Sequence, residues 1–200
     1  MLGIAILLIL AGVSLFFFSS QNKNKSSSPS PTSQDGAPTT SISQVDLGSG
    51  GSSYLDENGA YSILYPSDYT LDTQDAVHIR IYKRGEEERP QSEMSDGVLM
   101  VFESVNLSGK SLESLVDTRI KESTADGVTK VAGSKKAVTQ NSYSGFYYTL
   151  TGPGSSQNLI LQKDTSSTNA VVVTYSISDP EQKGYQAEVD AVLSSITLLK

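Results

Sequence analysis

Residues 98–102 read Val-Leu-Met-Val-Phe (VLMVF), an apolar run that decides the fold. The run follows residues 84–97 (RGEEERPQSEMSDG), a charged stretch with a proline that is typical of an exposed loop. Successive side chains of a strand point to opposite faces of a sheet, so a strand that is apolar at every position is covered on both sides. The run therefore predicts a central strand of a sheet with a packed layer on each face.

Two strand patterns precede this run. Residues 61–65 alternate before Pro66, and the turn signal Asn58-Gly59 predicts that they form a hairpin with Tyr54-Leu55. Residues 77–82 (VHIRIY) alternate between apolar and polar side chains. This alternation predicts a half-buried strand with one face in water.

Two helices are predicted after the run. Ser111 suits the N-cap of a helix that ends near Asp126-Gly127. Asp179-Pro180, with Gln182, predicts the start of a C-terminal helix whose first turn is weakened by Gly184. The apolar residues at helical spacing are Leu112, Leu115, Val116 and Ile120 in the first, and Tyr185, Val189, Val192, Leu193 and Ile196 in the second.

Four more strand patterns lie between the two helices, and short turns join them. They cover residues 128–138, 145–151, 158–163 and 170–177. Short turns join antiparallel neighbours, because a parallel crossover needs a dozen or more residues. The order of strands, helix, strands and helix predicts an α+β fold with an antiparallel sheet, in one domain over residues 54–200.

Residues 1–18 (MLGIAILLILAGVSLFFF) contain no charged side chain. As a helix they would span about 27 Å, close to the hydrocarbon thickness of a bilayer. We expect a transmembrane anchor, and a cleaved secretory signal or a buried helix are the alternatives. A cleaved signal fits less well, because no basic region precedes the run and no A-x-A-like site follows it.

Residues 19–53 are rich in Ser, Thr, Pro and Gly, which predicts a disordered linker. Such a stalk is typical of a domain displayed outside the cytoplasm. Lys23 and Lys25 follow the apolar run and favour the opposite orientation, because cations tend to stay on the cytoplasmic side. We expect a single-pass membrane protein with an extracytoplasmic domain.

The composition excludes several classes of function. The chain has 200 residues, a net charge of −7 and no cysteine. The negative charge argues against nucleic acid as a partner, because phosphate contacts need clustered Lys and Arg. The lack of cysteine excludes disulfides, thiolate metal sites and cysteine nucleophiles. We expect no cofactor.

Two segments resemble the PsbP-like domain family. Residues 61–71 (YSILYPSDYTL) resemble the family's opening strand, with Tyr69 where the family commonly has Trp. Residues 188–199 (EVDAVLSSITLL) resemble its closing helix and final short strand. The resemblance covers most of residues 54–200 in element order. It implies an α-β-α sandwich around an antiparallel sheet, in a family composed mostly of binding and assembly modules.

The ionisable residues suggest few catalytic or metal sites. His78 is the only histidine, and it is expected on the polar face of its strand, because no G-x-S-x-G sequence supports a catalytic triad. The loop after Arg84 carries five carboxylates, whose oxygens suit Ca²⁺. Their spacing matches no EF-hand, so we expect them to be solvated. They are Glu86, Glu87, Glu88, Glu93 and Asp96.

An aromatic cluster lies in the strand near residue 145. Phe146 and Tyr148 should face one side of this strand, and Tyr147 the other. Tyr143 and Tyr147 are the candidate partner-binding residues, because exposed amphipathic aromatic side chains suit protein interfaces.

We therefore expect a binding or assembly module that contacts a protein of the cell envelope and is not an enzyme. A small-ligand-binding or enzymatic domain, with a cleft of carboxylates and tyrosines, is the alternative. A third interpretation is that the chain is a structural component of the cell envelope with no discrete binding site.

Overall fold

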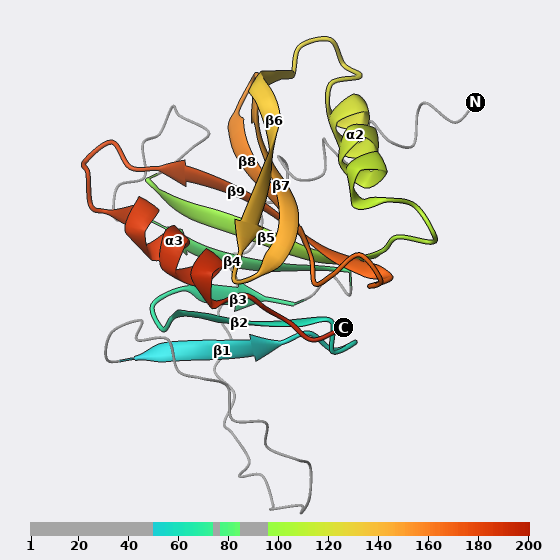
Figure 1. Ribbon diagram of the computed structural model, residues 1–200. Coiled ribbons are helices and arrows are strands. Elements are labelled where there is room, and N and C mark those ends of the chain that lie inside the picture. The colour runs from blue at the N-terminus through green and yellow to red at the C-terminus, as the bar shows by residue number, and fades with distance from the viewer. Residues whose placement is uncertain (1–49, 74–76, 85–95) are drawn as a thin grey trace, which may run out of the picture. The chain divides into compact units, whose positions relative to one another are not determined.

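The computed structural model describes residues 50–73, 77–84 and 96–200. These residues form two antiparallel sheets and two helices (Figure 1). The predicted α+β class with an antiparallel sheet is therefore confirmed. The apolar run at residues 1–18 and most of the linker lie outside the described residues. Among the helices that are described, none is long and apolar enough to cross a membrane.

The larger sheet has the strand order β3-β4-β5-β9-β8-β7-β6. Its strands are β3 (Thr70–Asp72), β4 (His78–Arg84), β5 (Gly97–Asn106), β6 (Lys130–Gln140), β7 (Tyr143–Thr151), β8 (Ser155–Gln162) and β9 (Asn169–Ser178). The VLMVF run lies in β5, between β4 and β9, so its prediction as a central strand is confirmed.

The two faces of this sheet bear separate cores. Met100 and Phe102 of β5 pack on one face with α3 (Tyr185–Ser195). On the other face, Val116 of α2 (Leu112–Ser123) packs against Ile160 and Val172. The two helices therefore cover opposite faces, as the α-β-α arrangement requires.

A smaller sheet, β1-β2-β10, shares the core on the α3 face. It consists of β1 (Gly51–Leu55), β2 (Tyr61–Pro66) and β10 (Thr197–Leu198). The predicted hairpin is confirmed, but it begins earlier than expected. Ser52 and Ser53 pair with Tyr65 and Leu64. Residues 51–53 therefore belong to the domain and not to the linker.

Helix α2 begins where the sequence predicts. The backbone N–H of Ser114 donates to Oγ of Ser111, which caps the helix. The helix ends at Ser123, a few residues before the expected Asp126-Gly127, and Thr124 is its C-cap.

Helix α3 begins later than the Asp179-Pro180 pattern predicts. It starts at Tyr185, after Gly184 in a left-handed conformation with φ of 90°. Asp179 still caps it, because its carboxylate accepts the backbone N–H groups of Lys183, Gly184 and Tyr185. The predicted N-cap position at Asp179 and the predicted helical turn at residues 180–184 are therefore wrong, although the Asp179 carboxylate still accepts the backbone N–H of Tyr185, the first residue of the helix.

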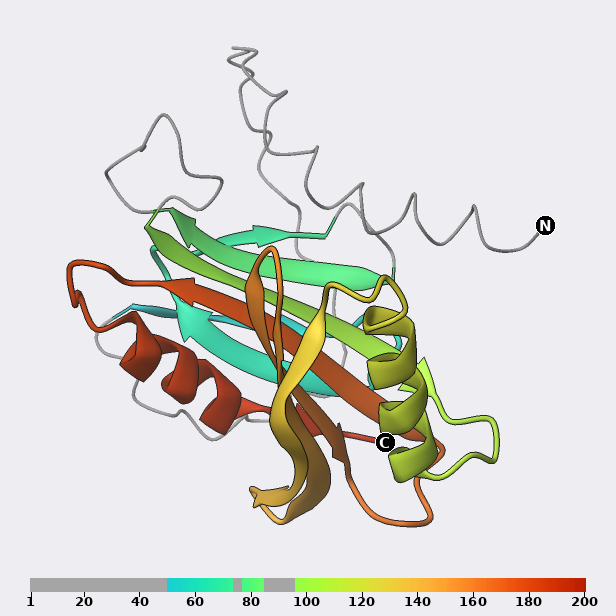
Figure 2. The same cartoon turned by 90° about the horizontal axis from the view of Figure 1, so that it is seen from above.

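The expectation that β5 is covered on both faces is only partly right. Val98, Met100 and Phe102 are buried, whereas Leu99 and Val101 on the α2 face are half-buried. Figure 2 shows α2 at one end of β4, β5 and β9.

Candidate functional site

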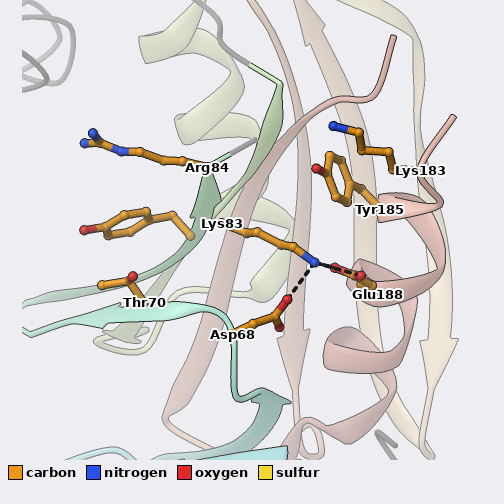
Figure 3. A pocket seen from close by; sticks show the side chains of 8 residues that line it. Asp68, Thr70, Lys83, Arg84, Lys183, Tyr185 and Glu188 are labelled. Carbon is orange, nitrogen blue, oxygen red and sulfur yellow. Dashed lines mark hydrogen bonds and ion pairs between the residues drawn. The ribbon is translucent and has the colours of Figure 1, made fainter. Parts of the chain in front are cut away.

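A cleft of about 800 Å³ lies between the end of β4 and the beginning of α3 (Figure 3). Its lining is mostly charged or aromatic. The lining residues are Asp68, Thr70, Tyr82, Lys83, Arg84, Lys183, Tyr185 and Glu188. β3 begins at Thr70, which pairs with Tyr82. Among the described residues, Lys83 and Arg84 therefore pair with β5 on one side and have no strand on the other. The cleft therefore opens at the edge of the larger sheet.

Lys83 stands at the centre of the cleft. Its Nζ lies 2.8 Å from Oδ2 of Asp68 and 3.1 Å from Oε1 of Glu188. The same Nζ lies 5.5 Å from the ring centroid of Tyr69 and 5.3 Å from that of Tyr185. Two carboxylates and two aromatic faces thus surround one ammonium group.

A hydrogen bond extends this arrangement into the core. The hydroxyl of buried Tyr69 donates to Oε2 of Glu188 at 2.7 Å. Burial, and then this hydrogen bond, raise the pKa of Tyr69, so the hydroxyl keeps its proton. Burial works to lower the pKa of Lys83, but the hydrogen bonds to Asp68 and Glu188 outweigh it and raise that pKa. Lys83 therefore carries its charge at neutral pH and is not a candidate base or amine nucleophile.

A second cation, Lys183, lies at the α3 end of the cleft. Its Nζ lies 2.7 Å from Oδ2 of Asp96 and 3.1 Å from Oε2 of Glu181. These hydrogen bonds, chiefly the one to Asp96, raise the pKa of Lys183. The other oxygen of Asp96, Oδ1, is buried and has no hydrogen-bond partner.

The burial of Asp96 corrects one expectation for the acidic loop. Its side chain is 4% exposed, so it is not solvated. The other four carboxylates, Glu86, Glu87, Glu88 and Glu93, lie outside the described residues. Among the residues that the structure does describe, no group of three or more His, Cys, Asp or Glu could hold a metal ion.

The third cation of the cleft, Arg84, stacks on an aromatic ring. Its Cζ lies 5.8 Å from the ring centroid of Tyr82, two residues earlier on the same face of β4. The facing residue on β5 is Gly97, with φ of 147°. A Cβ at Gly97 would lie 2.2 Å from the carbonyl oxygen of Lys83, so only glycine fits here.

His78 lies on the half-buried face of β4, as predicted. Its Nε2 is 3.7 Å from Oε2 of Glu103, the residue opposite it on β5. Oε1 of Glu103 accepts a hydrogen bond from Arg119 of α2 at 2.7 Å. His78 thus belongs to a group of polar side chains between sheet and helix, away from the cleft.

Tyr143 and Tyr147 lie on one face of β7, and both are half-buried against the α3-side core. The hydroxyl of Tyr143 accepts the backbone N–H of Leu198 at 3.2 Å. The hydroxyl of Tyr147 donates to Oε1 of Gln157 at 2.7 Å. Both hydroxyls therefore have partners inside the domain, and neither residue lines the cleft. Their role in partner binding stays a prediction.

The predicted division of the aromatic cluster is confirmed. Phe146 and Tyr148 pack into the core on the α2 face, opposite Tyr147. This follows directly from the alternation of side chains along β7.

The cleft was not predicted from the sequence, although the sequence contains one signal for it. Val77, Ile79 and Ile81 occupy alternate positions, and the next position on that face is Lys83. A lysine on the apolar face of a strand needs anionic partners, because burying an unpaired charge is costly. Those partners, Asp68 and Glu188, come from segments that no pattern in the sequence connects to β4.

Together, the fold and the cleft define an α+β domain with paired charges at the edge of its sheet. No protein-family model matches the chain, and no curated protein matches it. Among solved structures, the chain is similar to cyanobacterial PsbP (CyanoP) from Synechocystis sp. PCC 6803. The two are 12% identical over 78% of this chain and 97% of CyanoP, with a TM-score of 0.49.

The chain is also similar to a protein from Bacteroides thetaiotaomicron VPI-5482. The identity is again 12%, over 76% of this chain and 49% of the other, with a TM-score of 0.40. This chain thus spans about half the length of the Bacteroides protein. Both likenesses concern the fold and name no ligand or partner for this chain.

Proposed function

We propose that the chain is a membrane-anchored, extracytoplasmic binding module that holds another protein at the cleft. The observation that carries the proposal is the pairing of Lys83 with Asp68 and Glu188 in an open, charged cleft. Charges of both signs lie close together there, and a partner that presents the complementary pattern of charges can bind to them in addition to their present contacts.

The chemistry of the lining favours a protein over a small ligand. Small-molecule sites are lined predominantly by apolar side chains with few polar groups. Here five of the eight lining residues are charged, and two more are tyrosines. Arginine and tyrosine are the residues that contribute most at protein interfaces, which supports Arg84, Tyr82 and Tyr185 as contact residues.

The N-terminal segments supply the tether in this proposal. Residues 1–18 anchor the chain in the membrane, and the Ser/Thr/Pro-rich residues after them hold the domain away from the bilayer. The partner is then a protein of the cell envelope.

The cleft volume favours a second candidate function. A volume of about 800 Å³ lies within the range of ligand pockets. A small polar ligand that binds beside Tyr185 and Lys83 would make the chain a ligand-binding or enzymatic domain. Calorimetry with metabolite mixtures on the full chain distinguishes this candidate, because a protein-binding module would release no heat.

The test of the main proposal is photo-crosslinking in intact cells of the native host. A benzophenone amino acid at Thr70, an exposed residue of the cleft lining, should capture an envelope protein. The same probe at Val128, which is 58% exposed and lies outside the cleft lining, is the matched control. Equal capture at both positions, or none at Thr70, would count against a partner at the cleft.

The orientation of the chain in the membrane can be tested separately. A tag after Lys200 should be cut by protease added to intact cells, with lysed cells as the control. Protection until lysis would place the domain in the cytoplasm and make cytoplasmic proteins the candidate partners.

A further inference from the structure

Part of one face of the larger sheet lies beyond the reach of α2. Helix α2 contacts β7 and β8, and its Arg119 reaches only as far as Glu103 on β5. Farther along β5, Val101 and Leu99 are half-buried on this same face. Figure 2 looks onto this face and shows α2 at only one end of the strands.

The strand pairing shows which side chains surround Leu99 and Val101. Tyr82 of β4 and Ser176 of β9 lie on either side of Leu99. In the next row, Arg80 and Thr174 lie on either side of Val101. With Arg84, which follows Tyr82 on the same face, these side chains form what we call the open sheet face. Its members are Arg80, Tyr82, Arg84, Leu99, Val101, Thr174 and Ser176.

The open sheet face is richer in positive charge than the chain as a whole, although Asp72 pairs with Arg80 at its β3 edge. Arg80 and Arg84 are its charged members, whereas the chain carries −7. Among the residues that the structure describes, the carboxylates on the same side of these strands are Asp72, which lies 3.7 Å from Arg80, and Glu103, which is paired with Arg119 and lies 3.7 Å from His78. A guanidinium has five N–H donors, so each arginine can donate hydrogen bonds to a further carboxylate in addition to its present contacts.

We infer that the open sheet face binds an acidic segment of a protein partner, with carboxylates on Arg80 and Arg84 and an apolar side chain against Leu99 and Val101. The inference deepens the proposed function and rests on it, because Tyr82 and Arg84 line both the cleft and this face. The guanidinium of Arg84, whose Cζ lies 5.8 Å from the ring centroid of Tyr82, is a planar donor group that suits bidentate contact with a carboxylate.

A membrane surface fits the charges less well. An anionic membrane surface attracts clusters of four to eight Lys or Arg, and the open sheet face has two arginines on a chain of charge −7. An acidic segment of a protein partner needs only the local attraction of two arginines and a small apolar contact with Leu99 and Val101.

The experiment uses the full chain in its native membrane, with a benzophenone amino acid at Leu99 and mass spectrometry of the captured peptide. Leu55, which is 57% exposed on β1 of the smaller sheet, is the control position. The expected result is a protein adduct at Leu99 whose captured segment is rich in Asp and Glu. Adding Arg84→Glu should lower its yield about tenfold, because the charge contact becomes repulsive.

Two further variants distinguish a loss of charge contact from a loss of folding as the cause of a lower crosslinking yield. Arg84→Gln keeps a polar side chain and should also lower the yield, by less than Arg84→Glu. Lys110→Glu, an equal charge change at an exposed loop position outside this face, should leave the yield unchanged. The thermal unfolding midpoint of each variant, measured in parallel, shows that the domain is folded when the adduct is lost.

Four results would overturn the inference. They are a lipid adduct, an adduct to a second copy or to the chain's own residues, a captured segment without acidic residues, and a yield that does not respond to Arg84→Glu. If the probe at Thr70 still captures an envelope protein in any of these cases, the proposed function stands. Only the inference that the open sheet face binds an acidic segment is then rejected. If neither position captures a protein, both proposals fail.

Discussion

The side-chain amide of Asn141 donates to the backbone carbonyl of Ser194 at 2.7 Å, and so joins the turn between β6 and β7 to the end of α3. The side-chain amide of Gln140 also donates to the backbone carbonyl of Leu193, near the end of α3. The hydroxyl of Tyr143 accepts the backbone N–H of Leu198, in the strand that follows α3. The last carbonyls of a helix have no partner within the helix. The turn therefore supplies a cap for α3 from a distant part of the chain.

Replacing Asn141 should destabilise the domain. Asn141→Ala removes the cap and places alanine at φ of 50°, which asparagine tolerates better. We expect a loss of about 1–2 kcal/mol in the free energy of unfolding. Asn141→Gly should lose less, because glycine accepts the left-handed conformation. Urea unfolding followed by circular dichroism measures both, and equal losses would mean that backbone strain has no part.

Gly97→Ala should destabilise the domain more strongly. The new Cβ would lie 2.2 Å from the carbonyl oxygen of Lys83, and backbone atoms cannot move aside without breaking the pairing of β4 and β5. We expect a loss of about 2–4 kcal/mol. Gly154→Ala is the control, because no atom lies within 4 Å of a Cβ there, and it should change the stability little. Similar unfolding midpoints for the two variants would contradict the close approach at Gly97.

Lys83→Met should weaken the attachment of α3 to β4. The change leaves Asp68 and Glu188 without their shared cation, although both carboxylates keep some access to water. We expect a loss of about 1 kcal/mol, since solvent screens part of the interaction. Lys121→Met, at an exposed position of α2, is the control and should stay within about 0.5 kcal/mol of the unmodified chain. High salt should narrow the difference between the two variants.

The cap of α3 by Asp179 should depend on pH. Burial works to raise the pKa of Asp179, but hydrogen bonds from the backbone N–H groups of Lys183, Gly184 and Tyr185 lower it overall. Because the pKa is lower in the folded state, the stabilisation is present above the unfolded value of about 4 and is lost as the pH falls through the folded value. The unfolding midpoints of the unmodified chain and Asp179→Asn should therefore converge in acid. A constant difference from pH 7 to pH 2 would show that the charge does not matter.

Tyr147→Phe tests the aromatic prediction separately from folding. The change removes only the hydroxyl that bonds to Gln157, so a stability loss of about 1 kcal/mol is expected. If Tyr147 contacts a partner, Tyr147→Ala should lower capture of that partner in the Thr70 crosslinking experiment, while Tyr147→Phe should largely keep it. Unchanged capture by a folded Tyr147→Ala chain would remove Tyr147 from the candidates.

Local patterns predicted much of the fold. Alternation located β4, continuous apolarity located β5 at the centre of the sheet, and Ser111 marked the start of α2. Each of these signals acts within a few residues. The same alternation also placed Phe146 and Tyr147 on opposite faces, because it depends on nothing beyond the strand itself.

The errors arose where distant segments decide the structure. The cap of α3 reaches back across five residues to Asp179, so the helix starts later than the local pattern suggests. Lys83 occupies an apolar position because Asp68 and Glu188 are brought to it by the fold. The half-burial of Leu99 depends on how far α2 extends over the sheet. None of these relationships has a signature at a fixed spacing.

The smaller sheet has a consequence for synthesis of the protein. β2 has β1 on one side and β10 on the other, and β10 is formed by Thr197 and Leu198, near the end of the chain. During translation this edge of β2 stays open until Thr197 and Leu198 have left the ribosome. An unpaired apolar strand edge invites pairing with other nascent chains. A premature stop before Thr197 would therefore give a product that aggregates, even though both helices and nine of the ten described strands had been made.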